Sequence, residues 1–235
     1  MRYSPAEPGR IYRKISYGPL LDLFLLDMRS YRGPNDAHPE DHYGADAHLL
    51  GPKQLAWLKR ELTRSAATWK VIASDTPLGM IAASSPDART PLGRGIEIAD
   101  LLSCMQRAGI RNTVWITADL HYTAAHYFDP NHAVFQDFEP FWEFVSGPIH
   151  AGTWTLCGLD RTFGPRVVFQ SAASPEQGAN LAPCFGLQFF GHVAIDGATG
   201  VLTVTLKNVD DRALWSICLE PRPDQSARRL LQLPG

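Results

Sequence analysis

The chain has 235 residues, of which 45% are hydrophobic, 20% charged and 10% aromatic, and this composition excludes disordered and collagen-like proteins. It carries 22 Lys and Arg against 24 Asp and Glu, so its net charge of −2 offers no broad basic surface and we expect no nucleic-acid partner. No apolar run reaches the roughly 20 residues that cross a bilayer. The sequence therefore predicts a folded globular protein without a membrane span.

Three short apolar runs in the first half of the chain predict buried strands. They are residues 20–28 (LLDLFLLDM), 69–74 (WKVIAS) and 113–117 (TVWIT). Each run is shorter than an ordinary helix and is followed by polar residues, as is typical of strands in the middle of a sheet. We expect the three strands to lie in one sheet.

Helical periodicity fills the segments between these strands. Leu55, Leu58 and Leu62 recur at the spacing of one helix face and predict a helix over residues 54–65. A second helix is expected over residues 96–108, because the apolar spacing there is also helical. Repeated cycles of strand, polar loop and helix predict an α/β layered fold with helices outside a sheet.

A carboxylate follows each of the three predicted strands. Asp27, Asp75 and Asp119 stand at or just beyond the strand ends. Because the carboxyl ends of neighbouring parallel strands meet at one edge of a sheet, we expect these three residues at the same edge. That edge is the place where functional groups are expected in such folds.

The second half of the chain is predicted to be rich in β-structure. Strands are expected over residues 143–146, 166–171, 189–195, 201–206 and 214–219. The connection over residues 196–200 (DGATG) predicts a hairpin, whose strands would belong to a second sheet together with residues 214–219. Residues 221–235 are interpreted as a polar tail, in which residues 226–231 would fit a short helix.

The sharpest candidate for a metal site is the pair Asp119 and His121. In an extended chain residues i and i+2 point to the same side, so the carboxylate and the imidazole would converge on one metal ion or on two adjacent ions. The alternative interpretation is a helix-capping Asp and a partly buried His without a functional role. His126, His132 and His192 have no partner at a spacing that indicates a site.

Asp27 and Arg29 form a second candidate pair, with catalytic or substrate-binding roles. The carboxylate would orient the guanidinium, which would hold a phosphate or carboxylate group in bidentate fashion, although a purely structural ion pair is the alternative. The loop over residues 35–48 is a third candidate because it contains His38, His42 and His48 among acidic residues. A solvated loop is the simpler interpretation of that segment.

Motifs of other hydrolases and nucleotide-binding proteins are absent. The sequence has no G-x-S-x-G, no Walker loop and no G-x-G-x-x-G. Acidic and imidazole groups at strand ends suit a metal-activated water that attacks an electrophile. The sequence alone therefore favours metal-dependent hydrolysis over a covalent serine mechanism.

Six blocks in this order resemble the PhoD-like alkaline phosphatase family, within a match over residues 11–220. They are SYG (16–18), LLDLFLLDMRSYRG (20–33), GPKQLAWLKRELTRSAATWKVIASD (51–75), VWITADLHYTAAHY (114–127), FWEFVSGPIHAGT (141–153) and GLQFFGHVAIDGATGVLTVTLKN (186–208). This resemblance implies a metallophosphatase-like sandwich of two sheets flanked by helices. It also implies phosphate ester substrates, calcium and iron as cofactors, and Asp119 and His121 as the late metal motif of the family.

The resemblance covers only the C-terminal portion of the family's catalytic domain, which we assign to residues 1–220. The earlier metal motifs of the family do not occur before Leu20. Two functional interpretations follow: a metal-dependent phosphoester hydrolase that is incomplete in this chain and holds little metal, or a non-catalytic remnant that binds a partner. Family members are secreted or periplasmic, whereas residues 1–14 lack the apolar segment of a secretory signal.

A missing half would also leave apolar surface uncovered. We expect Phe24, Leu26, Trp115 and Ile116 to face the absent part of the fold and therefore to be exposed in this chain. Self-association would be the consequence, because exposed apolar surface and sheet edges favour pairing between chains.

Overall fold

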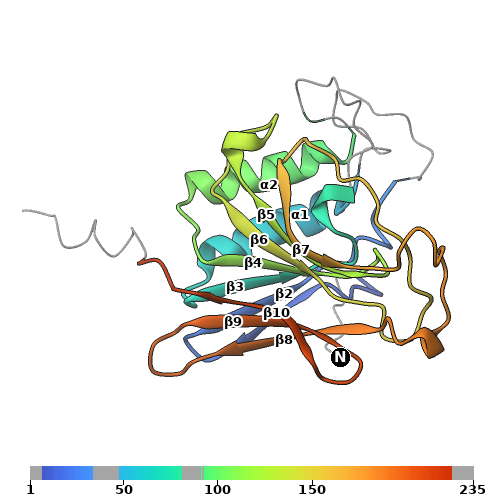
Figure 1. The fold of residues 1–235 in the computed structure, drawn as a ribbon. Coiled ribbons are helices and arrows are strands. Elements are labelled where there is room, and N and C mark those ends of the chain that lie inside the picture. The colour runs from blue at the N-terminus through green and yellow to red at the C-terminus, as the bar shows by residue number, and fades with distance from the viewer. Residues whose placement is uncertain (1–6, 34–47, 81–90, 92, 224–235) are drawn as a thin grey trace, which may run out of the picture.

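The computed structural model describes residues 7–33, 48–80, 91 and 93–223, and it contains two β-sheets and two α-helices in this part of the chain. The larger sheet has the order β1-β2-β3-β4-β6-β5-β7, and the smaller sheet has the order β10-β9-β8. Figure 1 shows α1 and α2 on one side of the larger sheet and the smaller sheet on the other. The α/β fold with two sheets and flanking helices, expected from the sequence, is therefore confirmed.

The elements follow in chain order. They are β1 (Arg13–Tyr17), β2 (Leu21–Leu25), α1 (Gly51–Arg64), β3 (Trp69–Ala73), the short 3-10 helix η2 (Leu78–Met80), α2 (Gly95–Arg107), β4 (Thr113–Thr117), β5 (Thr123–Phe128), the 3-10 helix η3 (Pro130–His132), β6 (Phe141–Val145), β7 (Pro165–Ser171), the 3-10 helix η4 (Pro183–Phe185), β8 (Phe189–Ile195), β9 (Leu202–Asn208) and β10 (Ala213–Leu219).

The three strands predicted from apolar runs are parallel neighbours in the larger sheet. Leu25 of β2 pairs with Ala73 of β3, which pairs with Ile116 of β4, so the three strands end level with one another. The backbone of Leu26 still donates a hydrogen bond of 2.9 Å to Ala73 beyond the end of β2. The carboxyl ends of β2, β3 and β4 therefore share one edge of the sheet, as the sequence predicted.

The helices bury one face of this sheet. Leu55, Leu58 and Leu62 of α1 are buried, as the helical spacing predicted. They belong to a core cluster that also contains Phe24 and Trp115 from the sheet. The apolar stripe of α1 thus packs on the strands, and burial of this kind supplies most of the stability of such a layer.

The expectation of exposed apolar surface on this sheet is wrong for three of the four residues named. Phe24 and Trp115 have no exposed side-chain surface and Leu26 is 7% exposed, because α1 and α2 of the same chain cover them. Ile116 is partly buried in the core between the two sheets. These four residues therefore give no physical reason for self-association.

The smaller sheet covers the other face of the larger sheet. Leu202, Val204 and Leu206 alternate along β9 and are buried, which is the pattern of a strand with one inward face. Trp215 of β10 lies 6.0 Å from Trp142 and 6.1 Å from Phe144, measured between ring centroids. The predicted C-terminal hairpin and third strand are thus confirmed as a second sheet.

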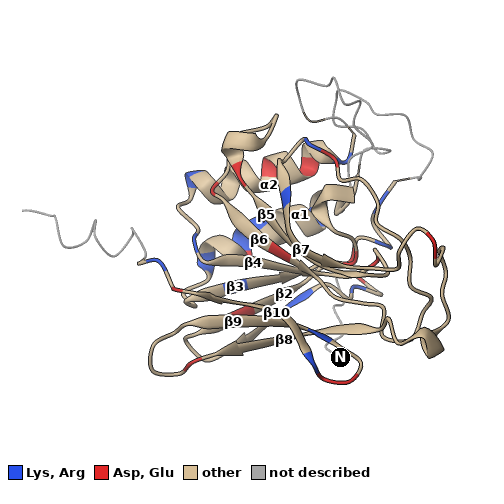
Figure 2. Cartoon of the chain, in the orientation of Figure 1, with Lys and Arg blue, Asp and Glu red and all other residues tan. Residues whose placement is uncertain are grey.

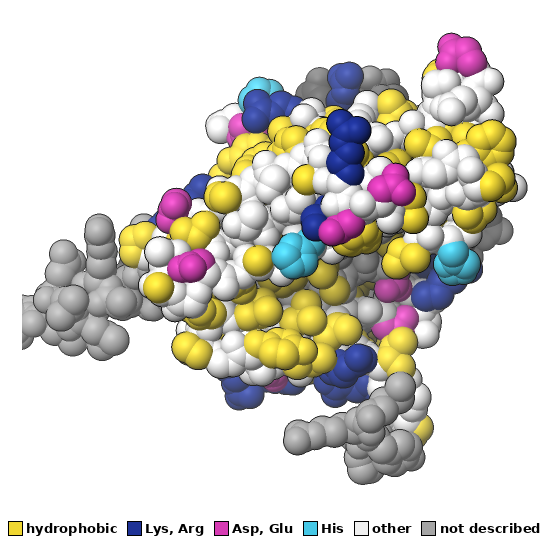
Figure 3. Space-filling model, turned by 60° about the horizontal axis from the view of Figure 1, so that its bottom comes forward, with side chains coloured by type: hydrophobic (Ala, Val, Ile, Leu, Met, Phe, Trp, Pro, Cys, Tyr) yellow, Lys and Arg dark blue, Asp and Glu magenta, His cyan; other side chains and the backbone are white. Residues whose placement is uncertain are grey.

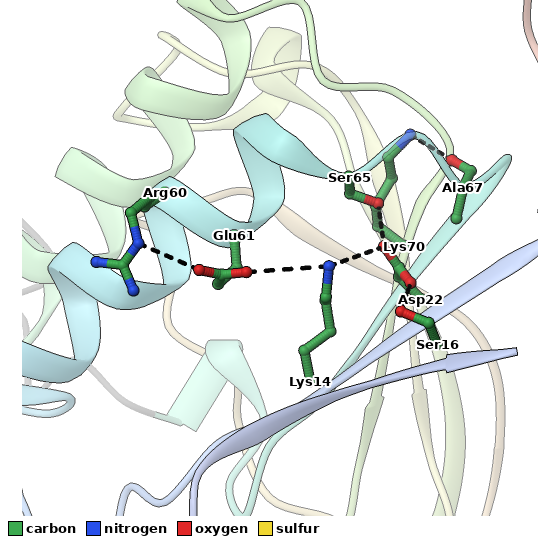
Figure 4. A network of polar contacts seen from close by, with 8 residues as sticks. All are labelled: Lys14, Ser16, Asp22, Arg60, Glu61, Ser65, Ala67 and Lys70. Carbon is green, nitrogen blue, oxygen red and sulfur yellow. Dashed lines mark hydrogen bonds and ion pairs between the residues drawn. The ribbon is translucent and has the colours of Figure 1, made fainter.

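Strand β1, which the sequence analysis did not predict, is fixed to β2 by a polar network. Asp22 accepts hydrogen bonds from the hydroxyls of Ser16 and Ser65, and its carboxylate lies 3.5 Å from Lys14 Nζ. Figure 4 shows these residues with the neighbouring hydrogen bond from Lys70 Nζ to the carbonyl of Ala67. The network ties β1, β2 and the end of α1 together.

Burial alone would raise the pKa of Asp22, but the two hydroxyl groups and the charge of Lys14 lower it below its ordinary value.

Across the rest of the molecule, basic and acidic residues are interspersed on the described elements (Figure 2). Among the described residues, no helix is long and apolar enough to cross a membrane. His38, His42 and the stretch 226–231 lie outside the described residues.

Candidate active site

The ends of β2 and β3 are joined by the carboxylate of Asp75. Its Oδ2 atom accepts hydrogen bonds from the backbone N–H groups of Met28, at 2.9 Å, and Arg29, at 3.0 Å. Asp75 itself is exposed. A carboxylate that receives two N–H groups is held in one orientation, and its second oxygen stays available to a ligand.

The ends of β3 and β4 are also joined, here by a hydrogen bond between two side chains. Thr76, directly after Asp75, donates a hydrogen bond of 3.3 Å from its hydroxyl to Asp119 Oδ2. Asp119 is exposed beyond the end of β4. The structure therefore brings Asp75 and Asp119 to one edge, through Thr76, a residue that the sequence analysis did not single out.

Asp27 reaches the same edge but turns its carboxylate toward its own backbone. It is buried, its Oδ1 accepts the N–H of Ser30 at 2.8 Å, and its backbone exchanges hydrogen bonds with the side chain of Gln54. Arg29 is exposed, and its side chain makes no hydrogen bond or ion pair with another described residue. The expected ion pair between Asp27 and Arg29 is not formed, because the Asp27 carboxylate closes the turn that carries Arg29.

The segment with Asp119 and His121 is not extended, and the argument from extended geometry is therefore wrong. Strand β4 ends at Thr117, and Asp119 and His121 have φ angles of 68° and 58°, in the left-handed region. Between them the N–H of Leu120 donates to the carbonyl of Ala118 at 2.9 Å. A tight turn, rather than strand alternation, sets the directions of these two side chains.

The orientation of His121 is fixed by a distant part of the chain. Its Nδ1 atom lies 2.6 Å from the carbonyl oxygen of Gly152, and Trp154 packs against the ring edge-on at a centroid distance of 6.4 Å. A carbonyl oxygen only accepts hydrogen bonds, so Nδ1 carries the proton. In the neutral imidazole the Nε2 atom then keeps its lone pair, which is the arrangement that metal-binding histidines use.

The donor set at this edge fits metal binding in part. The carboxylates of Asp75 and Asp119 are oxygen donors of the kind that calcium and iron accept, and the Nε2 atom of His121 is a donor for iron. Within the described ranges, however, no group of three or more His, Cys, Asp or Glu residues is arranged to hold a metal ion. The described residues thus include donor groups of the kind that such a site uses, without a complete shell.

Comparison with known proteins shows the family to which the chain belongs. The family model of PhoD-like phosphatases matches residues 1–206. The chain belongs to the PhoD-like phosphatase family. None of the curated proteins matches the chain.

A solved structure described as "Structure of PhoD" matches this PhoD-like chain with a TM-score of 0.55 and 17% sequence identity. The match covers 92% of the present chain and 43% of the PhoD chain, so the present chain spans less than half the length of that relative. At this identity the likeness concerns the fold. It agrees with the two sheets and flanking helices described above.

Two contacts of this candidate site escaped the sequence analysis for different reasons. Thr76 stands next to a predicted strand-end carboxylate, so its position could have marked it as a neighbour of the site. Gly152 acts through its backbone carbonyl and lies 31 residues from His121 in irregular structure. A backbone acceptor in such a segment leaves no signal in residue type or spacing.

Proposed function

We propose that the chain carries part of the active site of a metal-dependent phosphoester hydrolase of the alkaline phosphatase D or phosphodiesterase type. The observation that supports this proposal best is the orientation of His121, whose Nδ1 donates to Gly152 and whose Nε2 keeps its lone pair. Asp75 and Asp119 stand at the same edge of the sheet, joined through Thr76. Membership of the PhoD-like phosphatase family supports phosphate esters as the substrate class.

We assign distinct roles to the residues at this edge. Asp119 and His121 would be metal ligands, and a calcium or iron ion held there would lower the pKa of a bound water so that it attacks phosphorus. Arg29 would bind the phosphate group of the substrate, since its guanidinium is exposed and its backbone is fixed by Asp75. Asp27 would act indirectly, because its carboxylate shapes the turn from which Arg29 projects.

A non-catalytic role is the second candidate, and one observation favours it. The described residues contain no group of three or more metal-binding side chains, and two ligands seldom hold a catalytic metal. In that case the chain would bind a partner through its surface without turnover. Metal binding by the purified chain separates the two candidates.

The test is hydrolysis of bis(p-nitrophenyl) phosphate with added calcium and iron, together with titration calorimetry for each metal. Asp119→Asn and His121→Ala should each lower turnover and metal affinity at least about tenfold, since even loss of a residue that only orients a metal ligand has an effect of this size. His132→Ala is the matched control, since His132 is an exposed histidine whose imidazole contacts Asp129, away from the proposed ligands. Unchanged metal affinity in both site variants would overturn the ligand assignment.

The location and the oligomeric state are proposals of their own. We propose a periplasmic or secreted location, which the family resemblance implies and cell fractionation would test.

Exposed hydrophobic side chains include Ile149 and Phe185, at 76% and 61% exposure, and Figure 3 shows hydrophobic side chains gathered in a band across one face of the molecule. Self-association through such residues is measured as molar mass by light scattering.

A further inference from the structure

Glu143 and His126 form a buried polar pair in the larger sheet. Glu143 of β6 has no exposed side-chain surface and His126 of β5 is 1% exposed; the two residues are cross-strand partners. His126 Nδ1 lies 2.9 Å from Glu143 Oε1. Removing either residue would leave a buried polar group without its partner and would lower the stability of the fold, so we asked what the pair does in the structure.

Among the described residues, Glu143 is the hydrogen-bond partner of the His126 imidazole. Its Nε2 atom is buried and has no hydrogen-bond partner in the part of the chain that the structure describes. A carboxylate accepts hydrogen bonds, so Nδ1 carries the proton and holds Glu143 Oε1 in place. The second carboxylate oxygen of Glu143 is thereby directed at a fixed point.

That point is the backbone N–H of Leu78. It donates to Glu143 Oε2 at 2.6 Å, and Leu78 is fully buried at the start of η2. A short hydrogen bond from a backbone N–H to a buried carboxylate is among the stronger ones in proteins. The pair therefore anchors the chain three residues after Asp75.

The anchored segment is the one that connects the strand ends. Asp75 holds the backbone after β2, and Thr76 holds Asp119 after β4. Asp75 is exposed, whereas Leu78 packs in the core cluster beside the helices, so packing and the hydrogen bond to Glu143 act together at Leu78. The carbonyl of Gly79, in the middle of η2, accepts a hydrogen bond of 2.8 Å from the backbone N–H of Asp160, which also supports η2.

We propose that Glu143 and His126 are positioning residues of the candidate active site. Glu143 fixes Leu78, and with it the placement of Asp75 and Thr76 relative to β2 and β4, while His126 holds the orientation of the Glu143 carboxylate. The link to catalysis rests on the proposed function, whereas the link to the placement of residues 75–80 does not. The two links are therefore measured separately.

The first measurement is hydrogen exchange of backbone amides in Glu143→Leu. Loss of the acceptor should speed exchange of the Leu78 amide about tenfold to a hundredfold, and should also speed exchange in residues 79–80. The amides of β9 should change little. Glu97→Leu is the matched control, because Glu97 is also fully buried and accepts from the backbone N–H groups of Leu49 and Leu50, at 2.7 and 2.6 Å, before α1.

Glu143→Gln is the conservative variant. Its amide oxygen can accept from Leu78 and its NH₂ group can donate to His126, which would move the imidazole proton from Nδ1 to Nε2. We expect Leu78 to stay protected and the ¹⁵N shifts of His126 to report the exchanged tautomer. Should Glu143→Leu fail to fold, Glu143→Gln and His126→Gln carry the test, with faster Leu78 exchange expected only in the second.

Hydrolysis of bis(p-nitrophenyl) phosphate supplies the second measurement. Glu143→Leu should lower kcat more than tenfold, since small displacements of positioned groups have large effects on rate, and Glu143→Gln should restore most of it. Exchange that rises equally in β9 and in residues 78–80 would overturn the positioning role and leave a general effect on stability. A wild-type chain that binds neither calcium nor iron would refute the proposed function, while the exchange data would still decide the placement of Leu78.

Discussion

The Nδ1 atom of His121 donates a hydrogen bond of 2.6 Å to the carbonyl oxygen of Gly152, and this contact joins the turn after β4 to the irregular segment after β6. The same two segments are joined a second time by the N–H of Trp154, which donates to the carbonyl of His121 at 3.1 Å. The imidazole is therefore held by the backbone of a segment far away in the sequence. Its direction depends on where that segment lies.

Gly152→Ala should disturb this contact. A Cβ atom at residue 152 would lie 2.2 Å from Asn180 Oδ1 and 3.1 Å from the backbone carbon of Asn180, so the segment must shift. We expect weaker metal binding and ¹⁵N shifts of His121 that indicate a mixture of tautomers. Gly158→Ala is the control, because nothing lies within 4 Å of a Cβ atom there. A well-ordered Nδ1–H tautomer in Gly152→Ala would contradict the prediction.

The local pattern of the sequence predicted the layers of the fold well. Leu55, Leu58 and Leu62 point to one side because helix geometry places residues three and four apart together, and their burial follows. The apolar runs that end near Asp27 and before Asp75 predicted neighbouring strands for a similar reason. Such features depend on residues close in the sequence, which is why they could be predicted.

Features that depend on distant contacts could not be predicted in this way. Strand β1 is short and carries Arg13 and Lys14, and it forms a strand because β2 and the Asp22 network hold it. The positive φ angles of Asp119 and His121 replace the strand alternation that the spacing suggested. The partner of His126, Glu143, stands on another strand and has no sequence spacing that marks it.

Gly164→Ala should destabilise the fold strongly, and Gly18→Ala should serve as its control. Both glycines have left-handed φ angles, near 60°, so Ala is strained by about 1–2 kcal/mol at either position. Only at Gly164 would the Cβ atom also meet backbone, 2.7 Å from the nitrogen of Ala133. The free energy of unfolding, measured in urea, should therefore fall further in Gly164→Ala. Equal losses in the two variants would contradict the close approach.

Trp215→Ala should loosen the contact between the two sheets. The ring of Trp215 lies about 6 Å from the rings of Trp142, Phe144 and Phe169, all on the larger sheet. Because Trp215 is only partly buried, we expect a loss of about 2–3 kcal/mol in the free energy of unfolding, below the range for fully buried aromatic residues. Phe185→Ala, at an exposed aromatic residue of η4, should change this free energy by less than about 0.5 kcal/mol.

The last prediction concerns Asp22 and the acid stability of the chain. Its folded-state pKa lies below the ordinary value of 3.8, so the folded state favours the ionised carboxylate more than the unfolded state does. The resulting stabilisation is fully present above the ordinary pKa and is lost as the pH falls through the folded-state pKa. Asp22→Asn should therefore lower the free energy of unfolding at pH 7, by about 1–3 kcal/mol, and lower it by less at pH 3.

Urea unfolding of both proteins at pH 7 and pH 3 measures this difference. Other carboxylates with lowered pKa values, such as Glu7 and Asp196, also contribute to acid sensitivity, but they contribute equally to the wild type and to the variant. Asp210→Asn removes one exposed carboxylate outside the network and should leave the pH dependence nearly unchanged. If Asp22→Asn loses as much stability at pH 3 as at pH 7, the hydroxyl groups of Ser16 and Ser65 bind the neutral side chain equally well and the charge of Asp22 does not stabilise the fold.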